Sequence, residues 1–190
     1  MKFYIIKTPT IVQRLFSSYR WHFSSVPKEI YLTFDDGPSL GVTNFVLEKL
    51  KKHQKIYLKI QKEGYSLGNH TFNHLNGLLT KNNRYVENIQ QASVYIVSKL
   101  FRPPYGKLKS SQARLLQQEG YEIVMWDVLS GDFDKSIPPE KCLENVLKNT
   151  TNGSIIVMHD SEKSKDKIYY ALPRILDHFS QKGYLFKSII

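Results

Sequence analysis

The stretch Gln117-Gln118-Glu119-Gly120-Tyr121 leads from a polar helix end through a glycine into an apolar run. Residues 61–65 and 180–184 repeat this pattern, with glycine and tyrosine at the same places. Glycine adopts the left-handed conformation that ends many helices without a steric penalty, so each copy is typical of a helix-to-strand joint. Three such joints predict a repeated passage from helix to strand.

The apolar residues around these joints have the spacing of both kinds of element. One predicted helical face carries Tyr85, Ile89, Ala92, Ile96 and Leu100, and a second carries Ile168, Ala171, Leu172, Ile175 and Phe179. Short apolar strands are predicted at Ile30–Phe34, Ile123–Trp126 and Ile155–Met158. This alternation over the whole chain predicts a parallel α/β fold, either an open sheet or a barrel.

The length of 190 residues predicts one compact domain, residues 1–190. Within an N-terminal packing segment at residues 1–28, Pro9–Pro27 fits the alternation least. Its apolar positions suit an amphipathic helix that packs across an end of the domain, and these positions are Ile11, Val12, Leu15, Phe16 and Tyr19. The single cysteine, Cys142, excludes an internal disulfide, and its apolar neighbours predict that it lies on a buried helix face.

Charge and targeting signals narrow the expected partners. The formal net charge is +10, but the lysines are spread along the chain and do not form a nucleic-acid-binding module. The apolar run Phe3–Ile6 is shorter than the roughly 7 to 15 residues of a signal-peptide core, and no run is long enough to span a bilayer. We therefore expect no nucleic acid, no transmembrane segment and a cytoplasmic location. The sequence does not indicate an oligomeric state.

Polar groups of catalytic type recur at the ends of the predicted strands. They are Asp35 and Asp36, then His70 and His74, then Arg102 and Tyr105, then Asp127 and Asp132, and finally His159 and Asp160. The carboxyl ends of parallel strands share one face of such a fold, where active sites are built. Each motif alone is common, since Asp-Asp-Gly is an ordinary turn, but together they predict one active site.

The histidines and aspartates predict a metal site. His70 and His74 lie about one helical turn apart and can offer two imidazole nitrogens to one ion, while Asp35 or Asp36 supplies a carboxylate. Three protein ligands leave one position open for water, and the second aspartate can accept a proton from that water. Zinc is the expected metal for such a set, with cobalt and nickel as alternatives.

Four stretches together resemble the successive motifs of the polysaccharide deacetylases, carbohydrate esterase family four. They are Thr33–Gly37, His70–His74, Arg102–Gly106 and Val157–His159. The resemblance runs from about Tyr31 to the C-terminus. It implies a distorted, incomplete (β/α) barrel and the hydrolysis of an acetamido or acetyl-ester group on a saccharide. The expected substrate is an oligo- or polysaccharide that contains N-acetylglucosamine.

The resemblance also implies residue roles. Asp35 is the general base, and the metal ligands are Asp36, His70 and His74. Arg102 orients Asp35 and holds it ionised, because a guanidinium fork suits a carboxylate. The backbone N–H of Tyr105, together with the metal, holds the developing oxyanion. The side chain of Tyr105 has two open interpretations, stacking on a sugar ring or packing.

His159 takes the role of the general acid that protonates the leaving amine. The family usually offers an aspartate where Leu129 stands and a tryptophan where Phe133 stands. Asp132 is kept, but the usual partner of the acid histidine is predicted to be missing, and Asp127, Asp132 or Asp160 could substitute from another direction. On this interpretation, the pKa of His159 is lower than in relatives that have the partner.

A second departure concerns the barrel. Family members carry an apolar strand between the first helix and the segment before the first histidine, whereas this chain runs from Lys52-His53 into Gln54–Lys62. Either the barrel lacks a strand, or the sequence omits a stretch of the gene. Two alternatives to sugar deacetylation stay open. The same site chemistry would serve the hydrolysis of another small amide or imide, and the missing strand and missing partner of His159 leave a catalytically inactive saccharide-binding module.

Overall fold

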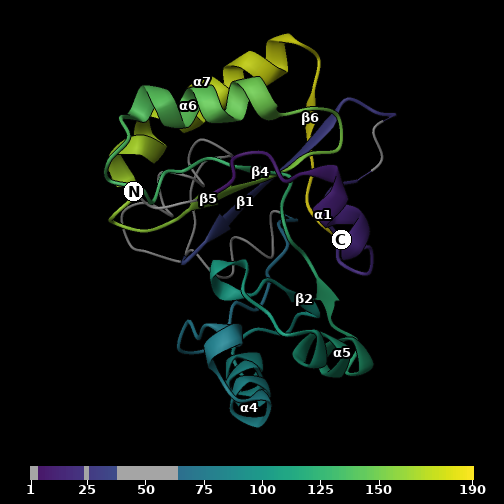
Figure 1. The fold of residues 1–190 in the computed structure, drawn as a ribbon. Helices are drawn as coiled ribbons and strands as arrows, with labels where there is room; N and C mark the ends of the chain where they lie inside the picture. The colour runs from purple at the N-terminus through teal and green to yellow at the C-terminus, as the bar shows by residue number, and fades with distance from the viewer. Residues whose placement is uncertain (1–3, 24–25, 38–63) are drawn as a thin grey trace. The chain divides into compact units, whose positions relative to one another are not determined.

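The computed structural model describes residues 4–23, 26–37 and 64–190 (Figure 1). The chain divides into two compact units. The first contains Met1–Val12, Trp21–Ser66 and Trp126–Ile190, and the second contains Gln13–Arg20 and Leu67–Met125. The first helix, α1 (Thr10–Leu15), contains the boundary after Val12.

The first unit is built on a four-stranded parallel sheet in the order β4-β5-β1-β6. The strands are β1 (Glu29–Asp35), β4 (Val128–Leu129), β5 (Ile155–His159) and β6 (Leu185–Phe186). Four successive residues of β5 are buried, which is typical of a central parallel strand. The register pairs Asp35 at the end of β1 with His159 at the end of β5.

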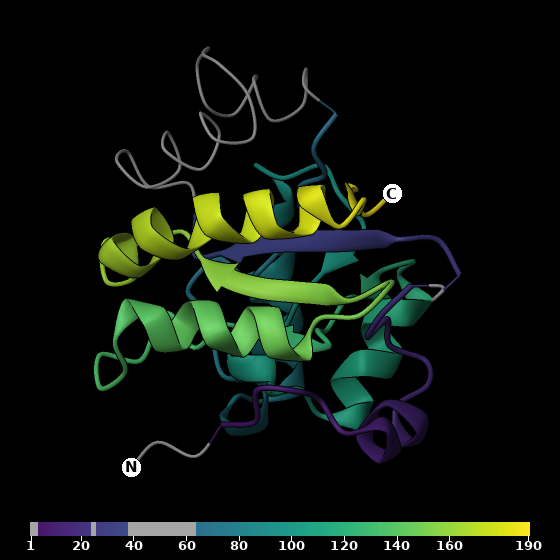
Figure 2. The same ribbon diagram turned by 90° about the horizontal axis from the view of Figure 1, so that it is seen from above.

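Two helices, α6 (Pro139–Asn149) and α7 (Lys165–Gln181), lie side by side along this sheet (Figures 1 and 2). The predicted apolar face of α7 is confirmed, because all five of its residues are buried: Ile168, Ala171, Leu172, Ile175 and Phe179. Cys142 on α6 is fully buried in the same core, as predicted. Burial is the largest of the effects that raise the pKa of its thiol to about 12, which makes it an inert packing residue.

The second unit pairs two short parallel strands, β2 (Leu100–Phe101) and β3 (Glu122–Ile123). Its helices are α4 (Asn82–Ser93) and α5 (Ser110–Gln118), with single 3₁₀ turns at η1 (Gly77–Leu79) and η2 (Pro104–Gly106). Its buried apolar residues include Tyr85, Ile89, Ala92, Phe101, Ala113, Leu116, Tyr121 and Ile123. This unit therefore has apolar packing of its own.

Two of the three predicted glycine joints are confirmed, one in each unit. Gly120 follows α5 with φ +82° and Gly183 follows α7 with φ +76°, and each leads to a tyrosine and a strand. Gly64 has φ +77°. These values lie in the left-handed region, where a side chain would strain the backbone.

Three predicted boundaries are wrong. The helix that carries Tyr85 ends at Ser93, before Ile96 and Leu100, because Val94-Tyr95-Ile96-Val97 combines β-branched and aromatic residues of low helix propensity. The predicted strand Ile123–Trp126 is divided, since β3 ends at Ile123 and β4 begins at Val128. In the N-terminal segment, α1 is shorter than predicted and contains no buried residue.

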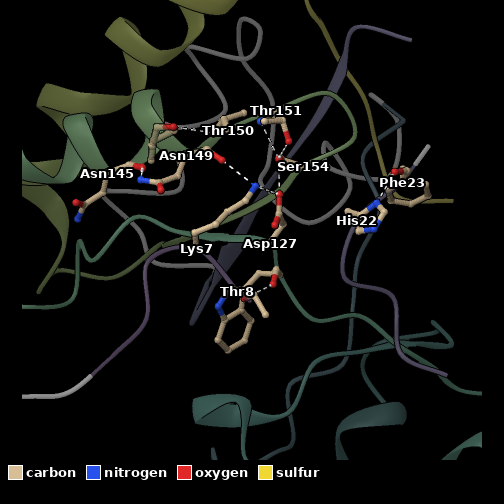
Figure 3. Close-up of polar contacts among 12 residues, drawn as sticks. Lys7, Thr8, His22, Phe23, Asp127, Asn145, Asn149, Thr150, Thr151 and Ser154 are labelled. Atoms are coloured by element: carbon tan, nitrogen blue, oxygen red, sulfur yellow. Dashed lines mark hydrogen bonds and ion pairs between the residues drawn. The ribbon is translucent and has the colours of Figure 1, made fainter. Parts of the chain in front are cut away.

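Extended backbone and a polar cluster hold the N-terminal segment instead. Lys7 and His22 form isolated antiparallel bridges to Val128 and Ser154. The Lys7 ammonium lies 2.5 Å from Asp127 Oδ2, which also accepts a 2.6 Å hydrogen bond from Ser154 Oγ (Figure 3). Because this contact occupies the buried Asp127 carboxylate, Asp127 belongs to a structural cluster.

The prediction of a parallel α/β fold is confirmed. Within the described residues, the strands form one four-stranded and one two-stranded sheet and do not close a barrel. The prediction that a strand is missing concerns Gln54–Lys62, which lies outside the described residues. In the part of the chain that the structure describes, no helix has the length and apolar character needed to cross a membrane.

Candidate active site

Two polar groups meet at the carboxyl ends of β1 and β5 in the first unit. Asp35 ends β1 and pairs in register with His159, and the N–H of Asp160 donates a 2.7 Å hydrogen bond to the Asp35 carbonyl. Asp36 follows with an exposed side chain and φ +67°. A β-carbon on Gly37 would lie 2.6 Å from Asp160 Oδ2, so a larger residue here would displace the Asp160 side chain. The parallel register therefore places both aspartates beside the strand that ends in His159.

Asp132 binds His159 through both carboxylate oxygens. Oδ1 lies 2.8 Å from the ring Nδ1 of His159, and Oδ2 accepts a 2.6 Å hydrogen bond from its backbone N–H. Asp132 is fully buried and the His159 side chain is 18% exposed. His159 therefore has a carboxylate partner, although the position usual in the family, Leu129, does not supply it. The residue that fills this place is Asp132, three positions after Leu129, and Leu129 lies buried in β4.

The surroundings of His159 shift the pKa of its imidazole in both directions. Burial lowers the pKa of the imidazole, but the hydrogen bond and charge of Asp132 raise it, as do the charges of Asp35 and Asp36. The net result is a pKa above the ordinary histidine value. Because Asp132 occupies Nδ1, the other ring nitrogen, Nε2, is the one that can transfer a proton.

In the second unit, His70 and His74 lie on a loop and not on a helix, contrary to the spacing argument. Their ring centroids are nevertheless 5.1 Å apart, and one ring nitrogen of each lies within 4.8 Å of the other. The loop achieves this with positive φ angles at Thr71 (+63°) and His74 (+53°). A threonine rarely takes this conformation, so the loop stores backbone strain between the two imidazoles.

Buried amides hold this loop. The side-chain oxygen of Asn88 on α4 accepts hydrogen bonds from the N–H groups of Phe72 (3.0 Å) and Asn73 (2.9 Å), and its Nδ2 donates to Asn73 Oδ1. Asn69 accepts from the N–H of Thr71 at 2.9 Å. Sequence reasoning missed Asn88. The sequence feature that could have identified Asn88 is its position beside Ile89, on the predicted buried face of a helix.

The hydrogen bonds of the two histidines suit metal ligation. His70 Nδ1 lies 2.7 Å from the carbonyl oxygen of Arg102, which can only accept, so Nδ1 carries the proton and Nε2 keeps its lone pair. His74 Nδ1 lies 3.1 Å from the hydroxyl of Tyr105. A carbonyl or hydroxyl that fixes one ring nitrogen while the other faces a metal is the usual arrangement around histidine ligands. Asp36, the third expected ligand, belongs to the first unit, whereas the two histidines belong to the second. A metal site formed by all three residues therefore stays a prediction.

Arg102 and Tyr105 flank this loop. The buried Arg102 guanidinium donates to the carbonyls of Val124 (3.1 Å) and Met125 (3.0 Å), and its predicted pairing with Asp35 stays a prediction. Tyr105 has φ +59° and a side chain that is 62% exposed. No hydrogen-bond partner for its backbone N–H is found among the described residues. That N–H fits the predicted oxyanion donor.

Positive φ angles mark the predicted motifs. Among the described residues other than glycine, they occur only at Asp36, Thr71, His74 and Tyr105. All four lie in the aspartate, histidine and Arg102–Gly106 motifs that the sequence singled out. Backbone strain of this kind gathers at functional sites, where the surrounding structure must maintain it.

The chain is similar in sequence to known deacetylases. The family model described as polysaccharide deacetylase matches residues 39–124. A chitooligosaccharide deacetylase of Azorhizobium caulinodans is 31% identical over 155 residues, covering 69% of this chain and 73% of the relative. A peptidoglycan-N-acetylglucosamine deacetylase of Bacillus cereus is 27% identical over 191 residues, covering 89% and 90%.

A solved structure extends the likeness to the fold. The crystal structure of a peptidoglycan N-acetylglucosamine deacetylase in complex with 4-naphthalen-1-yl-N-oxidanyl-benzamide matches with a TM-score of 0.82 and 26% identity. The match covers 96% of this chain and 95% of that chain. The chain therefore belongs to the polysaccharide deacetylase family, as its motifs predicted.

Proposed function

We propose that the chain hydrolyses the acetamide group of N-acetylated sugars, releasing acetate and leaving a free amine on the saccharide. Family membership supports this activity. The observation that carries the proposal is the contact between the buried Asp132 carboxylate and His159 at the end of β5. An amine is a poor leaving group, and a histidine whose pKa is raised by its carboxylate partner keeps its proton to higher pH than an ordinary histidine and can supply it.

The metal set of the proposal is Asp36, His70 and His74. Its fit rests on His70, whose Nδ1 donates to a carbonyl and so leaves Nε2 as a ligand atom. A divalent ion, with zinc as the expected metal and cobalt or nickel as alternatives, would polarise the acetyl carbonyl and lower the pKa of a water.

The remaining roles belong to side chains and one backbone donor. Asp35 accepts a proton from the attacking water, and Arg102 holds Asp35 ionised. The backbone N–H of Tyr105 donates to the oxyanion that develops on the acetyl oxygen. His159 then gives its Nε2 proton to the leaving nitrogen while Asp132 stabilises the imidazolium.

Acetate release tests this function. Purified protein of known metal content is incubated with peptidoglycan, chitin oligomers and acetylated xylan. We expect acetate from the first two, and we expect the Asp35→Asn variant to keep its metal but lose about 10²-fold in turnover. Release from xylan alone would mean an acetyl ester as substrate. Turnover of small imides without acetate release would favour the alternative amide hydrolase.

The inactive-module alternative had two supports. One was the missing partner of His159, and the contact with Asp132 removes it. The other was the missing strand near Gln54–Lys62, which lies outside the described residues. Absence of both bound metal and acetate release would favour this alternative.

A further inference from the structure

Lys167, in the first turn of α7, is a buried cation in an unfavourable place. It is 8% exposed, and the dipole of a helix disfavours positive charge near its N-terminus. Taking an ammonium out of water also costs free energy unless hydrogen bonds replace its hydration. Its Nζ donates to two backbone carbonyls, those of Asp132 at 3.1 Å and Asp134 at 2.8 Å. Both acceptors lie on the loop that carries the partner of His159.

The loop from Ser130 to Asp134 is also held from α6. Asn145 Nδ2 donates a 3.0 Å hydrogen bond to the Ser130 carbonyl, and the N–H of Asp134 closes a turn onto the Gly131 carbonyl at 3.0 Å. Gly131 has φ +79°, and a β-carbon there would come within 3.3 Å of Asn145 Nδ2. Hydrogen bonds from α6 and α7 therefore hold the backbone of the loop from Ser130 to Asp134.

The position of this loop decides the geometry of the acid histidine. Asp132 spans the ring and the backbone of His159 with contacts of 2.8 Å and 2.6 Å, and hydrogen bonds weaken steeply as they lengthen or bend. Lys167 holds the carbonyl of that same aspartate. Displacement of the loop would therefore change both contacts at once.

We propose that Lys167 is a positioning residue for deacetylation, because its ammonium fixes the backbone of Asp132 and Asp134 and so holds the Asp132 carboxylate against the His159 imidazole. This role rests on the proposed function, in which His159 protonates the leaving amine. Lys167 itself does not touch the reacting atoms. It acts through the loop, at the level of proton transfer and not of metal or substrate binding.

The test compares Lys167→Met, which keeps most of the unbranched side chain and removes its donors, with Lys165→Met on the same helix turn. Lys165 is partly exposed and pairs with Glu162 at 3.5 Å, away from the Asp132 loop contacts. We expect Lys167→Met to lower kcat about tenfold, a part of the ~10²- to 10⁴-fold that a general acid contributes. KM and zinc content should match the natural protein, and Lys165→Met should be unchanged in all three.

A second measurement does not need activity. Nitrogen and proton NMR of His159 reports the hydrogen bond at Nδ1 and the pKa of the imidazole, which faces Asp132, Asp35 and Asp36. In Lys167→Met, the Nδ1 proton signal should weaken and the pKa should fall, because the Asp132 contact lengthens. Lys167→Gln, which keeps one donor, should give intermediate values.

The outcomes separate this proposal from the proposed function. A natural protein that releases no acetate contradicts the function, whatever Lys167 does to the NMR signal. An active natural protein whose folded Lys167→Met variant has the same kcat and the same His159 signal overturns the positioning role. If neither Lys167→Met nor Lys167→Gln folds, Lys167 supports the whole domain, and the specific role is rejected.

Discussion

The two units hold their functional groups in different ways. In the first, Asp35 and His159 end neighbouring parallel strands, and Asp132 is a buried carboxylate fixed to His159 at two points. In the second, His70 and His74 lie on a strained loop that depends on the side-chain amide of Asn88. The difference teaches that backbone register places Asp35 and His159, whereas side-chain hydrogen bonds hold the loop of the two histidines expected to bind metal. We therefore expect proton transfer and metal binding to respond to different substitutions.

The largest effect should come from the histidines of the second unit. His74→Ala removes one of the three expected ligands, so we expect bound zinc and acetate release to be lost together. Elemental analysis and an acetate assay on the same preparation measure both. His178→Ala, outside every motif, is the matched control. A His74→Ala variant that keeps zinc and turnover would show that the site is assigned to the wrong residues.

Asp132→Asn should separate the acid from the metal. The variant keeps a hydrogen-bonding side chain but loses the charge that raises the pKa of His159, so this pKa should fall. His159 must be protonated to act as the acid, and the alkaline limb of kcat against pH should therefore move to lower pH. At neutral pH we expect a loss of about 10²-fold with normal zinc content. An alkaline limb that does not move would mean that another group is the acid.

Asn88→Ala should affect metal affinity more than chemistry. It removes the acceptor for two loop N–H groups, and such supporting contacts are commonly worth about 10- to 100-fold in metal affinity. We expect weaker zinc binding by titration but near-normal kcat at saturating zinc. Asn88→Asp keeps the acceptor and should bind zinc more tightly than Asn88→Ala. Equal zinc affinity in all three proteins would rule out the amide as the support of the loop.

The smallest effect on activity should come from the two helix-to-strand joints. Gly120→Ala and Gly183→Ala place a side chain at φ +82° and +76°, where the β-carbon meets no neighbouring atom. Each should cost roughly 1 to 2 kcal/mol of unfolding free energy from backbone strain alone. Denaturant melts measure the loss, and the acetate assay should be unchanged. Loss of activity without loss of stability would tie these joints to the site.

The sequence predicted well wherever a local rule acts. Glycine at helix ends and the apolar face of α7 are set by backbone sterics and by the helical period, and both predictions are confirmed. The order of motifs at strand ends predicted the family. Periodicity could not locate the end of α4, because Ile96 and Leu100 continue the spacing after the helix has ended.

The features of the site that the sequence did not predict depend on tertiary contacts. The partner of His159 was sought at Leu129, but that side chain is buried in the sheet while Asp132 reaches His159 from the following turn. The i, i+4 spacing of His70 and His74 suggested a helix, whereas a loop with two positive φ angles brings the rings together. Lys167 lies in no sequence motif, and its proposed role depends on carbonyls about 35 residues away in sequence. The sequence pattern therefore gave no reason to select it.

A zinc titration tests the central claim most directly. Metal-free protein receives increasing zinc, and acetate release from chitin oligomers is measured at each addition. The proposed site predicts no release without metal and a linear rise that ends at one zinc per chain, since His70, His74 and Asp36 would bind one ion. Release from metal-free protein, or no release at any zinc content from folded protein, would contradict metal-dependent deacetylation by this chain.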